Sequence, residues 1–477
     1  MSLSRTRFDA AWKAALDQAE KAAAQFGMDV VVTRDVLGRA GLLIDDRSSP
    51  LAHDALDVVA LRNAFTAATR PFTGLEPLLF GDKLFAPELY FDADDRVEIS
   101  ARQNTAISTG TATGTGTSAG QGVGSVHVLE RTVIGTDWAR KLPSPSTGAA
   151  ERRDRRVALY GFKGGVGRTT ATAVLARHLA GTGRCVLVVD LDLESPGVSN
   201  LLEDSAGLPR HGIVDHLVED GVGNAEGLEL VARSSVLPVK GNGEVWLAPA
   251  GGAPLEGESY DYLAKLNRIY SDLAGLNPGD GERPFAQRLE RAIAACEDQV
   301  TELSRRPDVI LLDSRAGMHD IAAVTLTHLS GLALLFAVDN PSTWEGYRML
   351  FGQWQRRPAL ARKLRERLRI VAAMFHSAGD AKRLPDLRDR AQQLFASTLY
   401  DQVDGDDGDE EPYHPPLEDN DAPHAPVPIL FGNDLVGLDP LRSRDWPELP
   451  FVEAAYRTFT ITVERLLPPP HPDPESS

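Results

Sequence analysis

The sequence is poor in cysteine, in aromatic residues and in long apolar runs. Cys185 and Cys296 are the only cysteines among 477 residues, so neither a disulfide framework nor a cysteine-rich metal site can be built. No run of about 18 apolar residues is present, and the N-terminus lacks the apolar segment of a secretory signal. We therefore expect a cytoplasmic protein with no membrane-spanning helix.

Positive charge is also scarce. The chain has 68 acidic against 50 basic residues and a net charge of −18, which argues against a protein that simply coats DNA or an anionic membrane. Ten of the acidic residues lie within 401–424, which has no lysine or arginine and contains four prolines. This composition predicts a disordered, solvated surface insertion, and we favour that interpretation over a binding role.

The first part of the chain, residues 1–142, predicts a small α+β domain of unknown role. A helix with period-3.6 spacing begins near Phe8 and stops at Gly27, and two short strands and a second helix follow. Residues 105–124 are Thr, Gly, Ala or Ser at 17 of 20 positions, which predicts a flexible loop. We expect a linker over 143–155.

From 156 to 468 the pattern changes to apolar strands that alternate with amphipathic helices. The strands are almost continuously apolar, so both of their faces should be covered by helices. This predicts an α/β fold with a doubly wound, mostly parallel sheet. The strands are expected at 157–162, 185–190, 245–249, 309–313, 332–339, 369–375 and 426–430, the helices at 169–181, 260–273, 283–304, 343–368 and 450–467, and a disordered tail at 469–477.

The strongest local motif is GFKGGVGRTT (161–170), which follows a strand and opens a helix. That context is the one in which a glycine-rich loop binds phosphate through its N–H groups and the helix N-terminus. Close backbone approach to phosphate is allowed by the glycines of the loop, Gly161, Gly164, Gly165 and Gly167. Thr169 stands where a hydroxyl would ligate Mg²⁺. A turn that merely joins strand and helix is much the weaker interpretation, because Lys163 and the threonine pair accompany the glycines.

Together with three later segments, this loop resembles the ParA/MinD-type P-loop ATPases, whose variant (deviant Walker A) loop carries an additional lysine at its start. Those segments are LVVDLDLESPGVS (187–199), VWLAPAGG (245–252) and VILLDSRAG (309–317). The resemblance implies a CobQ/CobB/MinD/ParA nucleotide-binding domain that binds ATP and Mg²⁺, dimerises on ATP binding and controls a partner. The loop positions that it implies for the nucleotide are Gly164, Gly165, Val166, Gly167, Arg168, Thr169 and Thr170.

The resemblance also implies the roles of single residues. Lys163 would reach the phosphates bound by the other subunit of a nucleotide-sandwich dimer. Asp192 would orient the attacking water. Mg²⁺ would be held by Thr169, Asp190 and Asp313, and Gly317 would start the nucleotide-sensing switch. The site carboxylates fit the physical requirement as well, because phosphoryl transfer needs positioning and charge neutralisation at strand ends.

One position departs from the family pattern, since Arg168 stands where the second lysine is usual. Arginine attracts phosphate and can bind it bidentately, but its planar fork is wider than the stem of lysine. Two hypotheses follow: an ATPase switch that uses Lys163, Arg168 and Asp192, and a nucleotide-gated scaffold with little or no hydrolysis. Adenine is implied only by the resemblance, because Phe375 and His376 stand where relatives often place an asparagine.

Two further segments allow other partners. Residues 356–369 carry seven basic side chains and one acidic one, which makes ATP-dependent DNA binding an alternative. The leucines at 360, 364 and 368 favour a solvated helix packed on the sheet instead. The last helix balances Glu453 and Glu464 against its arginines, so we expect core packing and no membrane binding. The N-terminal domain would then contact an unknown protein partner.

Overall fold

The computed structural model describes residues 7–35, 37–93, 96–98, 124–130, 136–138, 147–237, 241–253, 260–273, 282–376, 383–401, 412–435 and 446–470. It divides into two units, residues 1–141 and 142–477. The loop expected at 105–124 lies outside the described residues, as do most of the tail expected at 469–477 and the middle of the acidic segment.

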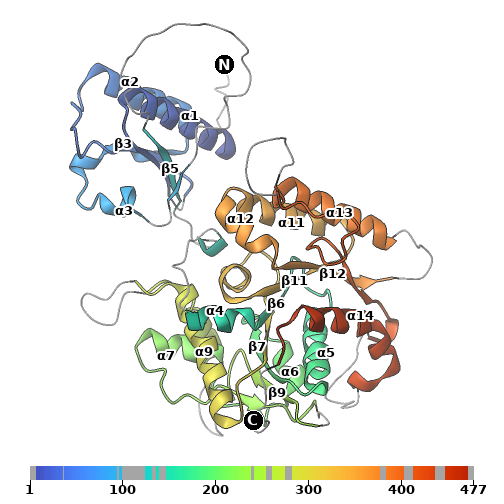
Figure 1. Ribbon diagram of the computed structural model, residues 1–477. Helices are drawn as coiled ribbons and strands as arrows, with labels where there is room; N and C mark the ends of the chain where they lie inside the picture. The colour runs from blue at the N-terminus through green and yellow to red at the C-terminus, as the bar shows by residue number, and fades with distance from the viewer. Residues whose placement is uncertain are drawn as a thin grey trace. The chain divides into compact units, whose positions relative to one another are not determined.

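The N-terminal unit is a five-stranded sheet in the order β3-β2-β1-β5-β4, with helices α1 and α2 packed on it (Figure 1). Gly27 ends α1 in the left-handed conformation that a glycine adopts without strain, with φ of 63°. Its elements are α1 (Phe8–Phe26), β1 (Val30–Arg34), β2 (Ala40–Ile44), α2 (Leu56–Thr69), β3 (Thr73–Phe80), η1 (Gly81–Lys83), α3 (Glu88–Phe91), β4 (Val97–Glu98), β5 (Val126–Glu130) and η3 (Thr136–Trp138).

The C-terminal unit contains an eight-stranded sheet in the order β13-β12-β11-β6-β10-β7-β9-β8. All neighbouring strands are parallel except β8 and β9, so the predicted doubly wound, mostly parallel α/β fold is confirmed. Apolar side chains of α5 and α14 pack on one face of the sheet, and those of α7 and α9 pack on the other. The strand that precedes the glycine-rich loop, β6, is central, and this places the loop at the middle of the sheet's carboxyl edge.

The helices of this unit are α4 (Thr147–Asp154), α5 (Arg168–Gly181), α6 (Val198–Leu202), α7 (Ile213–Gly221), α8 (Tyr262–Leu266), α9 (Phe285–Leu303), α10 (Asp320–Val324), η4 (Thr325–Leu329), α11 (Pro341–Gln355), α12 (Pro358–Arg365), α13 (Arg383–Thr398), η5 (Asn433–Leu435), η6 (Trp446–Glu448) and α14 (Pro450–Leu466). Its strands are β6 (Arg156–Gly161), β7 (Cys185–Leu191), β8 (Ala232–Arg233), β9 (Glu244–Ala248), β10 (Val309–Ser314), β11 (Leu332–Ala337), β12 (Leu368–Phe375) and β13 (Val427–Leu430).

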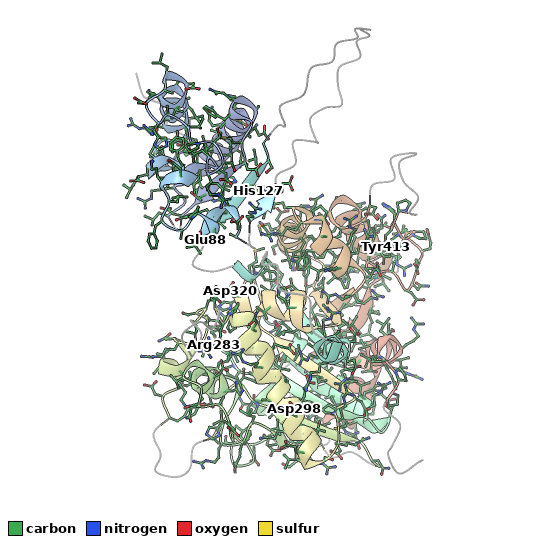
Figure 2. The ribbon with its side chains drawn as sticks, turned by 60° about the vertical axis from the view of Figure 1, so that its left-hand side comes forward. Glu88, His127, Arg283, Asp298, Asp320 and Tyr413 are labelled. Atoms are coloured by element: carbon green, nitrogen blue, oxygen red, sulfur yellow. The ribbon has the colours of Figure 1, made fainter. Side chains whose placement is uncertain are left out.

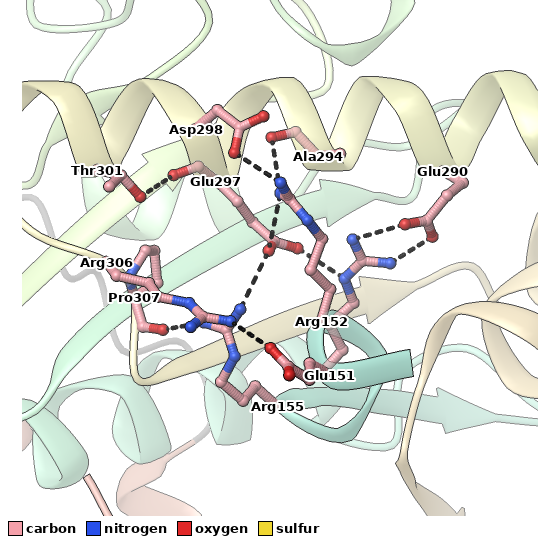
Figure 3. Close-up of polar contacts among 11 residues, drawn as sticks. Glu151, Arg152, Arg155, Glu290, Ala294, Glu297, Asp298, Thr301, Arg306 and Pro307 are labelled. Atoms are coloured by element: carbon pink, nitrogen blue, oxygen red, sulfur yellow. Dashed lines mark hydrogen bonds and ion pairs between the residues drawn. The ribbon is translucent and has the colours of Figure 1, made fainter. Parts of the chain in front are cut away.

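Within the linker expected over 143–155, residues 147–154 form helix α4. The arginines of this segment reach acidic side chains of α9, as Figure 3 shows. Arg152 Nη2 donates to Asp298 Oδ1 at 2.8 Å, and Arg156 Nε donates to the buried Glu297 at 2.7 Å. The basic run that resembled a solvated linker therefore forms ion pairs with the domain.

The acidic segment also differs from the expectation of disorder in its described part, residues 412–424. His424 is fully buried and its Nδ1 lies 2.7 Å from the hydroxyl of Tyr400. The ring of Tyr413, labelled in Figure 2, stacks under the guanidinium of Arg365 at 4.5 Å. Prolines and aromatic residues at the end of the segment supply packing that its acidic composition does not reveal.

Two predicted helices are also divided or shortened. The helix expected over 343–368 is two helices, α11 and α12, because Pro358 lacks the N–H that would continue the first and starts the second. The helix expected over 260–273 is reduced to α8 within its described residues.

Candidate nucleotide-binding site

The glycine-rich loop joins the carboxyl end of β6 to the N-terminus of α5. Gly165 and Gly167 have φ of 72° and 79°, values that side-chain-bearing residues rarely adopt, and they turn the loop back over the helix start. The loop encloses a hollow of about 230 Å³, the phosphate-loop hollow, lined by Lys163, Gly165, Val166, Gly167, Arg168, Thr169 and Thr170. A ring of backbone N–H groups at a helix N-terminus can bind an anion here.

Two of the carboxylates lie side by side at the sheet edge. Strands β7 and β10 are parallel neighbours, and Asp190 is paired in register with Asp313. Both are fully buried. Burial raises the pKa of Asp190 to about 7 and that of Asp313 to about 6, and each pKa reflects the nearby charges as well. Burial therefore disfavours full ionisation of this pair unless a cation is bound beside it.

These carboxylates suit a hard divalent cation. Asp313 Oδ2 is buried and has no hydrogen-bond partner among the described residues. Burial raises the pKa of Asp313, and Arg168 and the Thr169 hydroxyl, which lies close to the carboxylate, oppose that rise. Carboxylate and hydroxyl oxygens of this kind fit Mg²⁺ with part of its water shell, and Thr169, Asp190 and Asp313 would hold it.

Arg168 is the first residue of α5 and is almost fully buried. Its Nε donates to Asp313 Oδ1 and its Nη2 donates to Asp192 Oδ2, both at 3.2 Å. Burial raises the pKa of Asp192, which the charges of Arg168 and Arg315 oppose. The arginine therefore lies beneath the loop, where it neutralises two of the three carboxylates.

Lys163, by contrast, is exposed and turns toward another helix. Its ammonium group donates to the Ser342 hydroxyl, which in turn donates to Asn340 Oδ1 at 2.9 Å. Asn340 caps the N-terminus of α11 by accepting from the amide of Thr343 at 2.9 Å. Within one chain, the loop lysine thus contacts the start of α11 and no site carboxylate.

A second, apolar hollow of about 160 Å³ adjoins the loop on the side of β12 and β13. It is lined by Gly165, Val166, Gly167, Thr170, Met374, Ile429, Leu430, Phe431, Leu435 and Tyr456. Met374 has a φ of 52°, unusual for a residue with a side chain. The His376 ring lies 4.5 Å from that of Phe431. A flat apolar group attached to a loop-bound phosphate would fit between these walls.

Sequence reasoning missed a cluster around Glu194, two residues beyond Asp192. Glu194 accepts from the hydroxyl of Tyr270 and pairs with Arg315, and His319 Nε2 lies 3.3 Å from it. Arg315 thereby becomes a second cation beside Asp192. The spacing D-x-D-x-E and the sequence DSR were visible, but their partnership required the tertiary fold.

The segment that follows the strand of Asp313 is hydrogen-bonded to β6, the strand that ends in the phosphate loop. Gly317 donates its amide to Gly161 O at 3.2 Å and accepts from the Tyr160 hydroxyl at 3.2 Å. The segment expected to sense the nucleotide therefore makes direct hydrogen bonds to the strand that ends in the phosphate loop.

Several basic side chains of the segment 356–369 make contacts within the chain. Arg365 pairs with Asp401 at 2.8 Å, Arg367 donates to Ser330 O at 2.8 Å, and Arg369 donates to Leu368 O at 2.7 Å. The exposed basic residues that remain are Arg356, Arg362 and Lys363. Leu364 of α12 is fully buried, whereas Leu360 is half-buried and Leu368 is the first residue of β12, so the three leucines do not form one helix face. Among the described helices, none combines the length and hydropathy needed to cross a bilayer.

The parallel sheet, the loop between β6 and α5, and the carboxylates at neighbouring strand ends define a P-loop nucleotide-binding domain. Residues 157–387 match the family described as the CobQ/CobB/MinD/ParA nucleotide binding domain. The C-terminal unit therefore contains a domain of this family, and the predicted family resemblance is confirmed.

Several solved structures are similar to the chain. pNOB8 ParA is 16% identical, with a TM-score of 0.38, over 65% of this chain and 99% of that one. A ParA family ATPase from Chlorobium tepidum is 12% identical, with a TM-score of 0.39, over 65% and 99%. Cobyrinic acid a,c-diamide synthase from Mycobacterium smegmatis, solved with ADP and magnesium, is 21% identical, with a TM-score of 0.33, over 50% and 82%. No curated protein sequence matches the chain.

Proposed function

We propose that the protein is a Mg²⁺-dependent ATP-binding and ATP-hydrolysing switch. The observation that carries this proposal is the convergence of the phosphate-loop hollow, Arg168 and the carboxylates of Asp190, Asp192 and Asp313. Such a site offers the positioning and charge neutralisation that phosphoryl transfer requires.

The proposed roles follow from these positions. The backbone of Gly164–Thr169 binds the phosphates, and Arg168 adds a cation that can contact them bidentately. Thr169, Asp190 and Asp313 hold Mg²⁺, which neutralises phosphate charge when bound. Asp192 is the most exposed of the three carboxylates and orients the attacking water. For Arg168 to contact phosphate, its hydrogen bonds to Asp313 and Asp192 must be exchanged.

The apolar hollow supplies a place for the nucleotide base. Met374, Phe431 and Leu435 provide apolar walls beside the loop, and Tyr456 closes the side of α14. We propose that adenine binds there by stacking and shape. The described walls offer few side-chain donors, so discrimination among bases would depend on backbone groups.

Dimerisation is the proposed use of Lys163. In the single chain its ammonium group is exposed and hydrogen-bonded to the neutral Ser342 hydroxyl. Exchanging this contact for an anion should therefore cost little free energy. We propose that it completes the phosphate site of a second copy when ATP binds. The N-terminal unit would then deliver this change to a protein partner.

The test compares wild type with Asp192→Ala in phosphate release under saturating Mg·ATP. We expect the variant to fall to background while it still binds ATP, because Asp192 contacts Arg168 but is not required for the loop. Ser195→Ala, in the same turn, is the control and should hydrolyse normally. Equal rates for wild type and Asp192→Ala would contradict the hydrolysis proposal.

The second candidate is a nucleotide-gated scaffold that binds ATP and scarcely hydrolyses it. The observation in its favour is that Arg168 donates a hydrogen bond to Asp192, the carboxylate proposed to orient the attacking water. Under this proposal Arg168→Lys raises the hydrolysis rate about tenfold, since the compact ammonium of lysine lacks the planar fork by which Arg168 reaches Asp192 and Asp313 together. A lower rate would show that the arginine serves hydrolysis.

A further inference from the structure

The N-terminal unit brings together three side chains, two from the segment between β2 and α2 and one from the turn after β3. Asp46 lies two residues after β2, and Asp82 lies two residues after β3. These strands are parallel neighbours, with Ile44 in register with Phe80, so the two carboxylates lie at equivalent positions on one sheet edge. His53, on the segment that leads into α2, faces both of them.

The distances among these side chains match those of metal ligands. His53 Nε2 lies 3.3 Å from Asp82 Oδ1 and 3.8 Å from Asp46 Oδ2, and the three ligand atoms lie within 4.8 Å of one another. Ligands about 2.0–2.2 Å from a tetrahedral Zn²⁺ are roughly 3.3–3.6 Å apart. Small side-chain movements would therefore bring all three atoms onto one ion.

The ligand atoms are paired only with each other. His53 Nε2 and Asp82 Oδ1 are both buried, and their 3.3 Å ion pair falls short of hydrogen-bond geometry. Neither atom has a hydrogen-bond partner that meets this geometry among the described residues. An ion bound between them would satisfy both at once.

The surroundings hold the ligands in place. The His53 ring stacks on Phe80 with the ring centres 4.0 Å apart and the planes 14° apart. Asp46, which is fully buried, accepts from the amides of Leu51 and Asp82 at 3.0 and 2.9 Å. Lys83 binds Asp82 Oδ2 at 2.8 Å and leaves Oδ1 to face the cluster. Such outer contacts are what orient metal ligands.

We propose that Asp46, His53 and Asp82 form a binding site for a divalent transition-metal ion, with zinc as the best fit to one imidazole and two carboxylates. Two carboxylates and one lysine leave a net negative charge for the ion. His53 is 30% exposed, so a fourth position remains open to water. This site is separate in sequence and chemistry from the proposed nucleotide site.

The test uses the full chain, freed of metal by chelation and titrated with Co²⁺ in excess Mg²⁺, which occupies oxygen-only sites. We expect one equivalent of Co²⁺ with the visible absorption of a tetrahedral complex, displaced by Zn²⁺. His53→Gln and Asp82→Asn should each lose the band. Asp92→Asn, which changes an exposed carboxylate paired with Arg47 in the same unit, should keep it.

His53→Cys separates a lost ligand from a lost fold. A thiolate binds both metals, so this variant should retain one equivalent and gain intensity from sulfur ligation. Absence of the band in folded wild type, or its persistence in His53→Gln, overturns the proposal and leaves an ion pair between His53 and Asp82. Circular dichroism of each variant reports whether the unit is folded.

Discussion

The guanidinium of Arg168 donates to the fully buried carboxylate of Asp313 at 3.2 Å. A cation at the base of the phosphate loop and the carboxylate of the neighbouring strand thus neutralise each other within one chain. This pairing makes the same arginine a candidate phosphate ligand and a determinant of stability.

Removing the arginine should leave that buried carboxylate without its counter-charge. We expect Arg168→Ala to lower the free energy of unfolding at pH 7.5 by about 3 kcal/mol, because a buried pair that loses one partner strands the other charge. Urea unfolding in the absence of nucleotide measures this. Lys163→Ala, which removes an exposed cation of the same loop, should cost less than about 1 kcal/mol. Equal losses would mean that the pair is not what stabilises the site.

Dimerisation should depend on Lys163 and be independent of its partner within the chain. We expect Lys163→Ala to remain monomeric by light scattering with Mg·ATP, while wild type doubles its mass. Ser342→Ala is the matched control. It removes the contact that holds the lysine against α11, so the variant should dimerise at least as readily as wild type. Loss of dimerisation in Ser342→Ala alone would assign the contact to helix stability instead.

The contribution of Asp190 to the stability of the nucleotide-free protein should fall as pH rises. Burial raises the pKa of Asp190 to about 7, against about 3.9 in an unfolded chain, so the folded state binds more protons between these values. Its stabilising contribution is complete below about pH 4 and is lost as pH rises through 7. We expect this contribution to decline by up to about 4 kcal/mol between pH 4 and pH 8, measured by urea unfolding as the difference between wild type and a variant that cannot ionise at this position.

The matched variant for this effect is Asp190→Asn, which cannot ionise. Relative to wild type it should become steadily more stable from pH 4 to pH 8, whatever its absolute stability. Saturating Mg·ATP should reduce the wild-type decline, because a bound cation favours the ionised carboxylates. A constant difference between wild type and variant across this range would contradict the assignment of the pH dependence to Asp190.

The arginines near the start of the C-terminal unit, Arg152, Arg155 and Arg156, should stabilise the fold. Glu297 is buried and pairs with Arg156, Arg152 and Arg155 (Figure 3). We expect Glu297→Gln to lower the free energy of unfolding by about 3–5 kcal/mol, because it leaves clustered cations without their buried counter-charge. Asp298, on the same helix as Glu297, forms an exposed pair with Arg152. Asp298→Asn breaks this pair and should lower the free energy of unfolding by less than about 1 kcal/mol. Thermal or urea unfolding of both variants tests the difference.

Local sequence determined much of the nucleotide-binding unit. Glycine spacing, a preceding apolar strand and a following helix were enough to predict the loop at 161–170, because each acts within about one turn of chain. Continuous apolar strands predicted the parallel sheet, and the family and fold class that followed are confirmed. The catalytic and metal-binding roles of single residues stay predictions.

Only the tertiary structure decided which charges meet. Arg168 meets Asp192 and Arg156 meets Glu297 from 24 and 141 positions away, and His53 meets Asp82 from 29 positions away, so no local pattern encodes such contacts. The same holds for residues 147–154 and 412–424, whose composition predicted a linker and disorder. A charged run stays solvated when no partner faces it, and it becomes ordered when buried groups pair with it. The fold supplies those groups, so local composition does not reveal them.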